Sequence, residues 1–146
     1  MQKYILDTNI FNALFHNDTN AAAIRTHIAA QPTGSIFLCT VTIEEALRGV
    51  YAQIHDDETR KRAGDGHALL PIIVKELAKY SFLPYDDAGN ALFLAFPAAV
   101  RCVGAADCKI AAVVQVNSAV VVTRNTKHFA SIPATRHEDW TQAVSP

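Results

Sequence analysis

Tyr4-Ile5-Leu6-Asp7-Thr8-Asn9 is the stretch of sequence that decides how this chain folds. Its first three residues are apolar and its last three are polar, a pattern that predicts a short buried strand followed by a turn. We expect a helix to begin near Asn9 or Ile10, because Asp, Thr and Asn favour the position just before a helix. The stretch therefore predicts a carboxylate, that of Asp7, at the carboxyl end of a buried strand.

Short apolar segments with the character of strands alternate with helical segments along the rest of the chain. The expected strands cover residues 4–6, 35–39, 81–84, 119–122 and, as an edge strand, 135–137. The expected helices cover residues 20–30, 42–54, 86–96 and 105–116, with a helical region over 56–80 that Pro71 divides and a short terminal helix around Trp140. The strands are continuous apolar runs, which is typical of a parallel sheet covered on both faces. The sequence therefore predicts an α/β fold, a three-layer α/β/α sandwich around a parallel sheet of four to five strands.

Length and composition favour one globular domain over residues 1–146. Half of the 146 residues are apolar, and no apolar run approaches the roughly 20 residues of a membrane span. The N-terminal apolar run is too short for a signal peptide, so we expect a cytoplasmic protein with no membrane association. The three cysteines, Cys39, Cys102 and Cys108, include no C-x-x-C pair, which argues against a disulfide framework and a zinc ribbon. We expect reduced, structural thiols.

Acidic side chains follow the expected strands at the points where ligands bind in open parallel sheets. Asp7 follows the first strand, and Glu44 and Glu45 lie just past the second. Asp107 opens the helix that leads into the strand 119–122, which the polar residues 123–125 follow. Because ligands bind outside the carboxyl ends of parallel strands, these side chains are expected to converge at one edge of the sheet.

Crowded carboxylates of this kind favour one class of chemistry. Neighbouring negative charges repel and raise the pKa of at least one member, unless a cation compensates. Oxygen ligands suit Mg²⁺ or Mn²⁺, and such ions bind phosphates, lower the pKa of a bound water and offset charge in a transition state. The arrangement therefore favours phosphodiester hydrolysis. The net charge of −1 argues against many unspecific phosphate contacts, so a local basic patch and a narrow choice of substrate are expected.

Each of these elements also has a purely structural interpretation. Asp7 could simply cap a helix, and Glu45 stands three residues after Thr42, as in a capping box. Asp107 could be placed for the helix dipole, and the basic run 59–62 could be a solvated helix face. No single element decides between structure and chemistry, so the functional interpretation depends on their joint placement.

Four motifs in this order resemble those of PIN-domain ribonucleases, in particular the VapC-like toxins of type II (VapBC) toxin–antitoxin systems. Residues 4–10 look like the family's hydrophobic-D-T-N start. Residues 42–49 resemble its second motif, an acidic residue four positions before a glycine, which selects Glu45 over Glu44. Residues 104–112 are similar to the third motif, G-x-x-D followed by I-A-A, and residues 121–129 to the fourth, T-x-[ND] ending in Phe. The tail 132–140 also fits, so the resemblance runs from residue 4 to residue 140.

The resemblance implies a PIN-like sandwich, a bound Mg²⁺ or Mn²⁺, and endonucleolytic cleavage of RNA, whether tRNA, rRNA or mRNA. It also implies a homodimer, and inhibition by a cognate antitoxin protein that covers or enters the acidic site. One position departs from the commoner pattern, because Asn125 stands where many members carry an acid. An amide oxygen can still bind a metal but brings no charge. We interpret Asn125 as a variant that weakens metal affinity, or that leaves a second metal to bind only with substrate.

The same interpretation assigns a role to each motif residue. Asp7, Glu45 and Asp107 are the expected metal ligands, directly or through water, and Asn125 completes the catalytic pocket. Three neighbours are expected to orient the carboxylates or support the turn: Thr8, Asn9 and Thr123. Three flanking basic residues are candidates for phosphate contacts, or equally for surface ion pairs: Arg48, Arg124 and Lys127. Metal-activated water would attack the phosphorus in line and leave a 5′-phosphate and a 3′-hydroxyl, without a Ser, Cys or His nucleophile.

Two other functions remain open from the residues. A phosphatase of the haloacid dehalogenase kind also starts with a strand and an aspartate, but Asn9 stands where its second aspartate would be and no lysine motif completes the set. A non-catalytic binding module that keeps the fold is the alternative that Asn125 and the near-neutral charge leave open. Three mutually repelling acids argue against that alternative. RNA rather than DNA follows from the resemblance alone, since the motifs contact only the phosphate that both share.

Overall fold

One five-stranded sheet forms the centre of the molecule. The computed structural model describes residues 1–55 and 63–143. Its strands are β1 (Tyr4–Leu6), β2 (Ile36–Cys39), β3 (Ser81–Leu83), β4 (Val120–Val122) and β5 (His137–Glu138). They pair in the order β3-β2-β1-β4-β5, and every pairing is parallel. The predicted parallel α/β architecture is confirmed, with β3 and β5 at the two edges.

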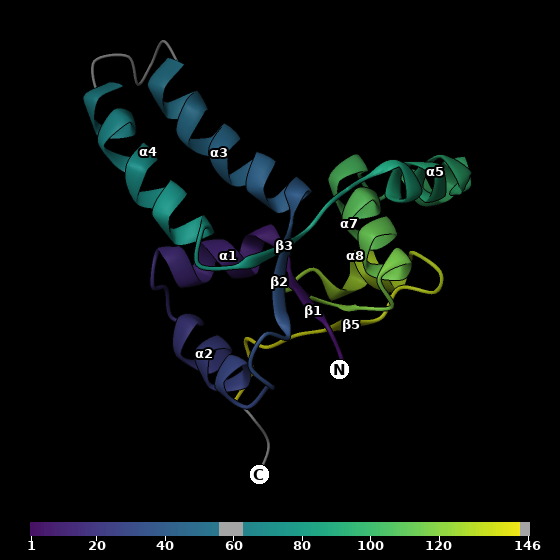
Figure 1. Cartoon of the computed structure of the whole chain (residues 1–146). Coiled ribbons are helices and arrows are strands. Elements are labelled where there is room, and N and C mark those ends of the chain that lie inside the picture. Colours follow the sequence, from purple (N-terminus) through teal and green to yellow (C-terminus); the bar gives the residue numbers. More distant parts are fainter. Residues whose placement is uncertain (56–62, 144–146) are drawn as a thin grey trace.

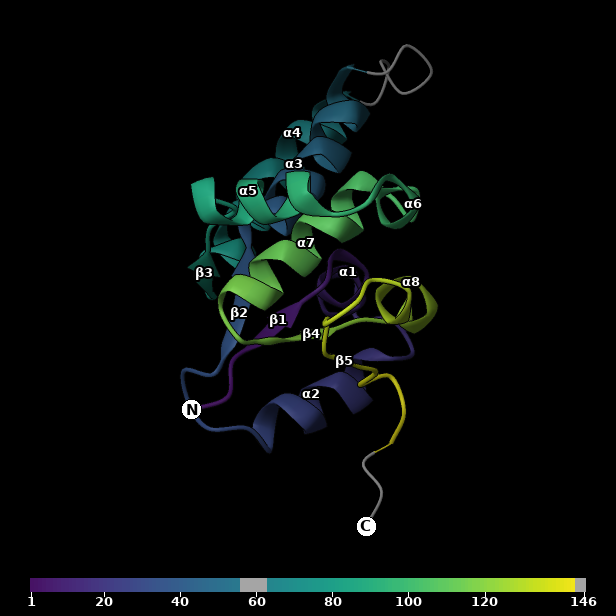
Figure 2. The same ribbon diagram turned by 90° about the vertical axis from the view of Figure 1, so that its right-hand side faces the viewer.

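Helices cover both faces of this sheet (Figure 1, Figure 2). They are α1 (Thr8–Phe15), α2 (Ala21–Ala29), α3 (Thr40–His55), α4 (Ala63–Leu77), α5 (Asp87–Ala95), α6 (Ala98–Arg101), α7 (Ala105–Val116) and α8 (Thr126–Ala130). Alternate residues of a strand point to opposite faces. Ile5 and Val121 accordingly pack in the core that contains α7, whereas Leu6 and Val122 pack in the core that contains α1. The result is the predicted three-layer sandwich.

Helix α7 lies against the sheet and has the bounds that the sequence predicts. Its residues 110–114 are all buried, as expected for a helix that is apolar almost all round. Gly104 precedes it with a φ of 143°, a conformation that residues with a side chain rarely adopt. Because α7 runs back toward the amino ends of the strands, its first turn, with Asp107, lies at the carboxyl edge of the sheet.

Helix α3 begins earlier than the sequence predicts. It starts at Thr40, so Thr42 lies inside the helix and does not cap it. Thr42 is fully buried, and its hydroxyl donates to the backbone carbonyl of Leu6 at 3.4 Å. The capping-box interpretation of Thr42 and Glu45 is therefore wrong, because the hydroxyl is used to join α3 to β1.

Helix α4 is continuous through Pro71, although the sequence predicts a break there. A proline inside a helix removes one backbone N–H and leaves a carbonyl without its usual partner. Pro71 is exposed, so water can replace that hydrogen bond and the helix need not end. The charged residues 56–62, which are expected to open this helical region and which include the basic run 59–62, lie outside the described residues.

The prediction of a terminal helix around Trp140 is wrong, because side-chain contacts hold this segment in an irregular conformation. The Trp140 indole is 1% exposed, stacks on His27 with ring centroids 5.4 Å apart, and donates to Glu138 Oε2 at 2.7 Å. The backbone N–H and the hydroxyl of Thr141 both donate to Asp139, which makes a turn. The short helices α6 and α8 are not predicted either. No helix in the described part of the chain is long and apolar enough to cross a membrane.

Candidate active site

Asp7 stands at the carboxyl end of β1 and caps α1. It is 3% exposed and accepts three hydrogen bonds. These come from the backbone N–H of Thr8 (2.7 Å), the hydroxyl of Thr123 (2.8 Å) and the carboxamide of Asn9 (3.2 Å). Asp7 therefore caps the helix, as the purely structural interpretation expects. A cap needs only backbone N–H donors, however, and two of the three donors to Asp7 are side chains.

Burial raises the pKa of Asp7 from 3.8 to about 6. Hydrogen bonds from Thr123 and Thr8 lower this pKa, and the negative charges of Asp107 and Glu45 raise it further. The three carboxylates predicted as metal ligands therefore lie close enough to influence one another. A charged Asp7 is unfavourable in the chain alone, and a cation beside it would relieve that cost.

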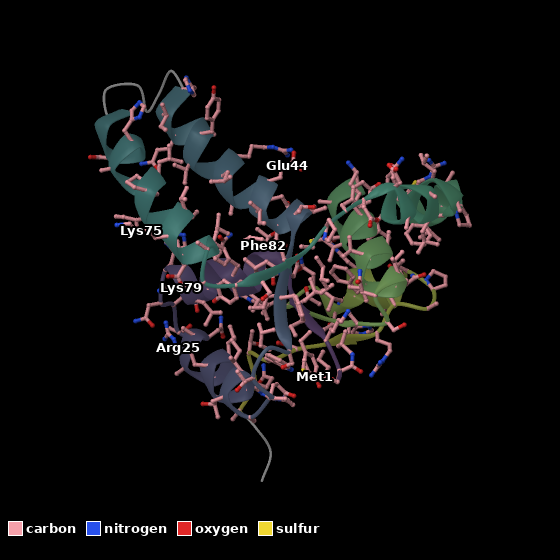
Figure 3. All side chains as sticks on the ribbon, viewed as in Figure 1. Met1, Arg25, Glu44, Lys75, Lys79 and Phe82 are labelled. Atoms are coloured by element: carbon pink, nitrogen blue, oxygen red, sulfur yellow. The ribbon has the colours of Figure 1, made fainter. Side chains whose placement is uncertain are left out.

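Glu44 and Glu45 are adjacent on α3 but have different surroundings. Oε1 of Glu45 accepts a hydrogen bond from the hydroxyl of Thr8 at 2.7 Å, which ties α3 to the start of α1. Glu44 is exposed and pairs with Arg48, one turn later on the same helix. Figure 3 shows Glu44 on the side of α3 that is turned away from α4. The structure thus brings Glu45, and not Glu44, to the neighbourhood of the buried aspartate.

Asp107 pairs with a residue that sequence reasoning missed. Its Oδ2 lies 2.7 Å from Nδ1 of His128, on α8. The side chain of Asp107 is 19% exposed and that of His128 is 52% exposed, so the pair borders solvent. His128 stands three residues after Asn125, on the short helix α8, which the sequence does not predict. No signal in the sequence therefore points to His128.

The loop after β4 is joined to Asp7 through Thr123. Thr123 is fully buried, donates its hydroxyl to Asp7 and accepts from the backbone N–H of Asn125 at 2.9 Å. The carboxamide oxygen of Asn9 accepts from the backbone N–H of Arg124 at 3.2 Å, so Asn9 links α1 to the same loop. Asn125 itself is exposed, and its side chain has no hydrogen-bond partner among the residues 1–55 and 63–143. Its amide is therefore beside the site without being fixed by the protein.

The three basic residues expected to contact phosphate are exposed and differ in their partners. Arg48 is paired with Glu44, which is the surface ion pair of the alternative interpretation. Arg124 and Lys127 form no ion pair within the described part of the chain, and both follow β4 at the carboxyl edge of the sheet. Their charges are available to a phosphate, whereas Arg48 would have to exchange its partner.

The donor set suits a hydrated cation rather than a closed metal cage. Among the described residues, no group of three or more His, Cys, Asp or Glu side chains is gathered so as to hold a metal ion. A carboxylate offers about four lone pairs. Asp7 uses three of them in hydrogen bonds, and Glu45 and Asp107 use one each. Mg²⁺ keeps several waters and binds through one or two carboxylates together with substrate phosphates, which this open set allows.

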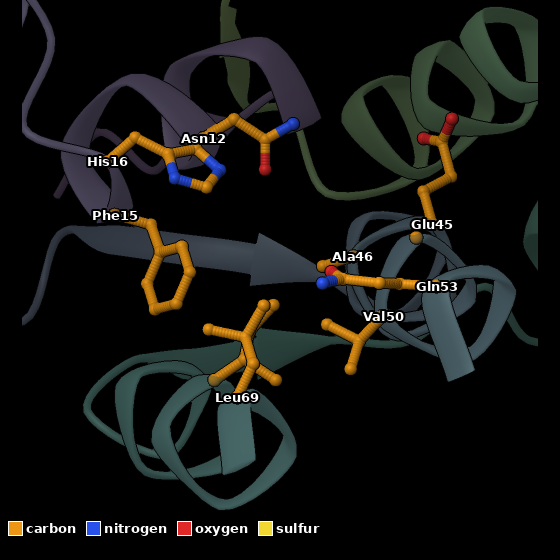
Figure 4. A pocket seen from close by; sticks show the side chains of 10 residues that line it. Asn12, Phe15, His16, Glu45, Ala46, Val50, Gln53 and Leu69 are labelled. Atoms are coloured by element: carbon orange, nitrogen blue, oxygen red, sulfur yellow. The ribbon is translucent and has the colours of Figure 1, made fainter. Parts of the chain in front are cut away.

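A cavity of about 260 Å³ opens beside Glu45, between α1, α3 and α4. Figure 4 shows Phe15, Val50 and Leu69 among the side chains that line it, with the carboxylate of Glu45 turned away from them. Asn12 of α1 and His16, which follows this helix, border the same cavity. An apolar surface therefore lies directly next to one of the acids.

Three solved structures share this fold at low sequence identity. The chain is similar to the DNA-bound VapBC from Salmonella typhimurium, with 24% identity and a TM-score of 0.71 over 96% of this chain and 99% of that chain. It is similar to VapBC2 from Rickettsia felis bound to a promoter DNA fragment, with 20% identity and a TM-score of 0.71 over 95% and 99%. It is also similar to VapBC-1 from nontypeable Haemophilus influenzae, with 18% identity and a TM-score of 0.72 over 97% of this chain and 100% of that chain. None of the curated proteins compared with this sequence matches it.

The PIN-domain family model matches residues 4–134. The matched region contains β1 to β4 and α1 to α8. It also contains the four residues predicted to form the catalytic pocket: Asp7, Glu45, Asp107 and Asn125. A match of this extent is not confined to one motif or one edge of the sheet. The chain therefore belongs to the PIN-domain family.

Proposed function

We propose that this protein is a divalent-metal-dependent endoribonuclease that acts as the toxin of a toxin–antitoxin pair. One observation carries the proposal: Asp7 is buried at the carboxyl end of β1, held by Thr123 and Asn9, and the charges of Glu45 and Asp107 lie close enough to raise its pKa further. A chain that served only as a scaffold would be more stable with an uncharged residue in this place. Binding of a cation together with a phosphate would explain why three carboxylates lie close together.

Asp7, Glu45 and Asp107 would hold Mg²⁺ or Mn²⁺, directly or through water, at the carboxyl edge of the sheet. An ion of this kind supplies an activated water for in-line attack on phosphorus and offsets the charge on the phosphoryl oxygens. In this scheme the chain needs no Ser, Cys or His nucleophile. The products would carry a 5′-phosphate and a 3′-hydroxyl.

The neighbours of the acids act by orientation. Thr123 and Asn9 hold the buried aspartate through their hydrogen bonds, and Thr8 holds the glutamate on α3. Asn125 would complete the pocket on the β4 side with a neutral amide oxygen. Because it brings no charge, metal binding should depend more on the three acids and on the phosphate of the substrate.

Basic residues beside the acids would hold the RNA backbone. Arg124 and Lys127 follow β4 with no carboxylate partner in the described chain, and Arg48 would join them by leaving Glu44. A net charge of −1 permits few such contacts, which favours a structured or narrowly chosen RNA over any RNA at random.

A cognate antitoxin is the proposed partner, and a homodimer the proposed assembly. The similar solved structures carry the name VapBC, which supports a partner of this kind without identifying it. The cavity beside Glu45, which apolar and polar side chains line together, is a place where an antitoxin segment could bind and cover the acids.

The first test is cleavage of total RNA by the purified, antitoxin-free protein in Mn²⁺ or Mg²⁺. We expect discrete products with 5′-phosphate ends, which disappear in EDTA and in the Asp7→Asn variant. Products that end in a 2′,3′-cyclic phosphate, or cleavage that persists in EDTA, would contradict the proposed chemistry.

A non-catalytic binding module is the second candidate. It is favoured by the absence of a ready-made metal-binding group among the described residues and by the neutral Asn125. Calorimetric titration with Mn²⁺ separates the two candidates. The nuclease must bind the ion, and Asp7→Asn should weaken that binding. A protein that binds no Mn²⁺ and cleaves no RNA would support the binding module.

A further inference from the structure

A small cleft separates the first half of α3 from the start of α7. It has a volume of about 120 Å³, and its polar lining consists of Glu44, Glu45, Arg48 and Lys109. Glu45 borders both this cleft and the larger cavity next to α4. The cleft therefore has room for a small polar group, such as a phosphate, directly beside one of the acids of the site.

Lys109 is the cation of this cleft that no described carboxylate neutralises. The two glutamates are already engaged, one by Arg48 and one by the hydroxyl of Thr8. The ammonium of Lys109 lies 5.5 Å from the ring centroid of Tyr85 and 5.7 Å from that of Phe93. Aromatic faces attract an ammonium and hold it in place, but they carry no charge that would cancel its own. The positive charge of Lys109 is therefore both positioned and available.

The aromatic support of Lys109 belongs to the same edge of the sheet as the acids. Tyr85 follows the carboxyl end of β3, and its backbone N–H donates to the hydroxyl of Thr40 at the start of α3 (2.9 Å). Its own hydroxyl donates to Asn90 on α5 (2.9 Å). Asp107 stands two residues before Lys109 on α7. The cleft and the acidic site are thus neighbours along the carboxyl edge, where ligands of parallel sheets bind.

We propose that this cleft is a phosphate subsite for an RNA nucleotide next to the one that is cleaved, and that Lys109 binds that phosphate. The inference rests on the proposed function and extends it to a residue outside the metal-binding set. A strand whose scissile phosphate lies at the acids presents its neighbouring phosphates nearby. The cleft offers one of these phosphates the ammonium of Lys109. Because two rings already restrict this long side chain, it loses little conformational entropy on binding.

Binding of a short single-stranded RNA in EDTA tests the subsite without cleavage. Lys109→Gln should weaken the affinity severalfold and lower the slope of log Kd against log salt by about 0.7, as expected for the loss of one phosphate contact to a single strand. Lys109→Arg should retain most of the affinity. Lys3→Gln is the matched control, because the ammonium of Lys3 also lies over a ring, 6.0 Å from the centroid of Phe37, but at the amino end of β1. It should change neither quantity.

The outcomes separate this inference from the proposed function. If the wild type binds and cleaves RNA but Lys109→Gln leaves affinity and slope unchanged, the subsite is wrong and the nuclease stands. If the wild type neither binds nor cleaves RNA, both are wrong. If Lys109→Gln leaves RNA binding intact and weakens binding of an oligoglutamate peptide instead, the cleft serves a protein partner and the RNA subsite is overturned.

Discussion

At the scale of single residues, the electrostatics of the site centre on Asp7. Its carboxylate is almost completely buried and receives three hydrogen bonds, yet its pKa rises to about 6 because burial outweighs them. A rise from 3.8 to about 6 corresponds to roughly 3 kcal/mol between the charged and neutral forms. The folded chain thus disfavours the charge that a metal ligand must carry.

This cost should appear as a pH dependence of stability in the metal-free protein. The pKa of Asp7 is higher in the folded than in the unfolded chain, so the folded state binds the proton more tightly. The free energy of unfolding that protonated Asp7 contributes is therefore lost as the pH rises from 3.8 to about 6. Relative to Asp7→Asn, the wild type should lose about 3 kcal/mol of unfolding free energy between pH 3.5 and pH 7. Urea denaturation in EDTA measures the difference. A constant difference across this range would contradict the raised pKa.

His128 should matter for metal affinity although it is not an expected ligand. Its hydrogen bond to Asp107 restricts the orientation of that carboxylate, and partners of this kind change metal affinity or activity by about 10–100-fold. His128→Ala should weaken Mn²⁺ binding within that range, and His128→Asn, which can still donate a hydrogen bond, should restore part of it. Calorimetric titration is the measurement. An unchanged affinity in His128→Ala would show that Asp107 needs no such support.

The residues of the site are predictable where the chain itself places them at strand ends. Asp7 and Thr123 directly follow β1 and β4, so the topology alone brings them together. The choice of Glu45 over Glu44 follows from the resemblance to the family's second motif, in which the acid stands four positions before a glycine. His128 could not be found in this way, because its contact with Asp107 depends on the orientation of α8, which the sequence pattern does not predict.

At the scale of elements, α3 and α4 pack closely through a glycine. A Cβ added to Gly66 would lie 2.7 Å from Cγ1 and 3.3 Å from the backbone N of Ile54, whereas one added to Gly64 would meet no described atom within 4 Å. Both glycines belong to α4, so they form a matched pair for testing the packing.

Alanine at these two positions should have opposite effects on stability. Gly66→Ala should lower the unfolding free energy by about 1–3 kcal/mol, because the Ile54 side chain must shift and the backbone of α3 must give by a few tenths of an ångström to admit the methyl group. Gly64→Ala should raise it by up to about 1 kcal/mol, because alanine loses less conformational entropy in a helix. Thermal or urea denaturation measures the unfolding free energy of each variant relative to the wild type. Equal effects would mean that α4 does not approach Ile54 in this way.

The elements themselves were predictable where apolar period and length agree, as for β1, β4 and α7. The start of α3 was not, because the hydroxyl of Thr42 is used by a tertiary contact with Leu6 that outweighs its local preference as a cap. The segment around Trp140 was not, because burial of its indole against His27 fixes an irregular backbone. In both places long-range packing overrides the local signal.

At the scale of the whole molecule, a near-neutral chain must bind a polyanion through few contacts. Four cations lie beside the acids or in the adjoining cleft: Arg48, Lys109, Arg124 and Lys127. Single-stranded nucleic acid releases about 0.7 counterion per phosphate contact, so about four contacts give a log–log salt slope near −3. Filter binding at several salt concentrations measures this slope. A slope near −7 would require a much larger basic surface than these residues provide.

The parallel sheet and its two helical layers follow from the sequence because buried parallel strands are continuous apolar runs and need helical connections. The family membership supports the same architecture over residues 4–134. Substrate and partner do not follow in the same way. The acids would act through a metal ion on a phosphate that every nucleic acid shares. Recognition of one RNA or one antitoxin depends on surfaces without a motif.

The central claim is that Glu45 belongs to a metal-dependent nuclease site, and the adjacent Glu44 supplies its most direct control. The measurement is the rate of Mn²⁺-dependent cleavage of total RNA by the wild type, Glu45→Gln and Glu44→Gln. We expect Glu45→Gln to lose nearly all activity. Glu44→Gln, which removes the exposed partner of Arg48 and leaves that arginine free for phosphate, should keep at least the wild-type rate. Equal activity of the two variants, or no metal-dependent cleavage by the wild type, would contradict the claim.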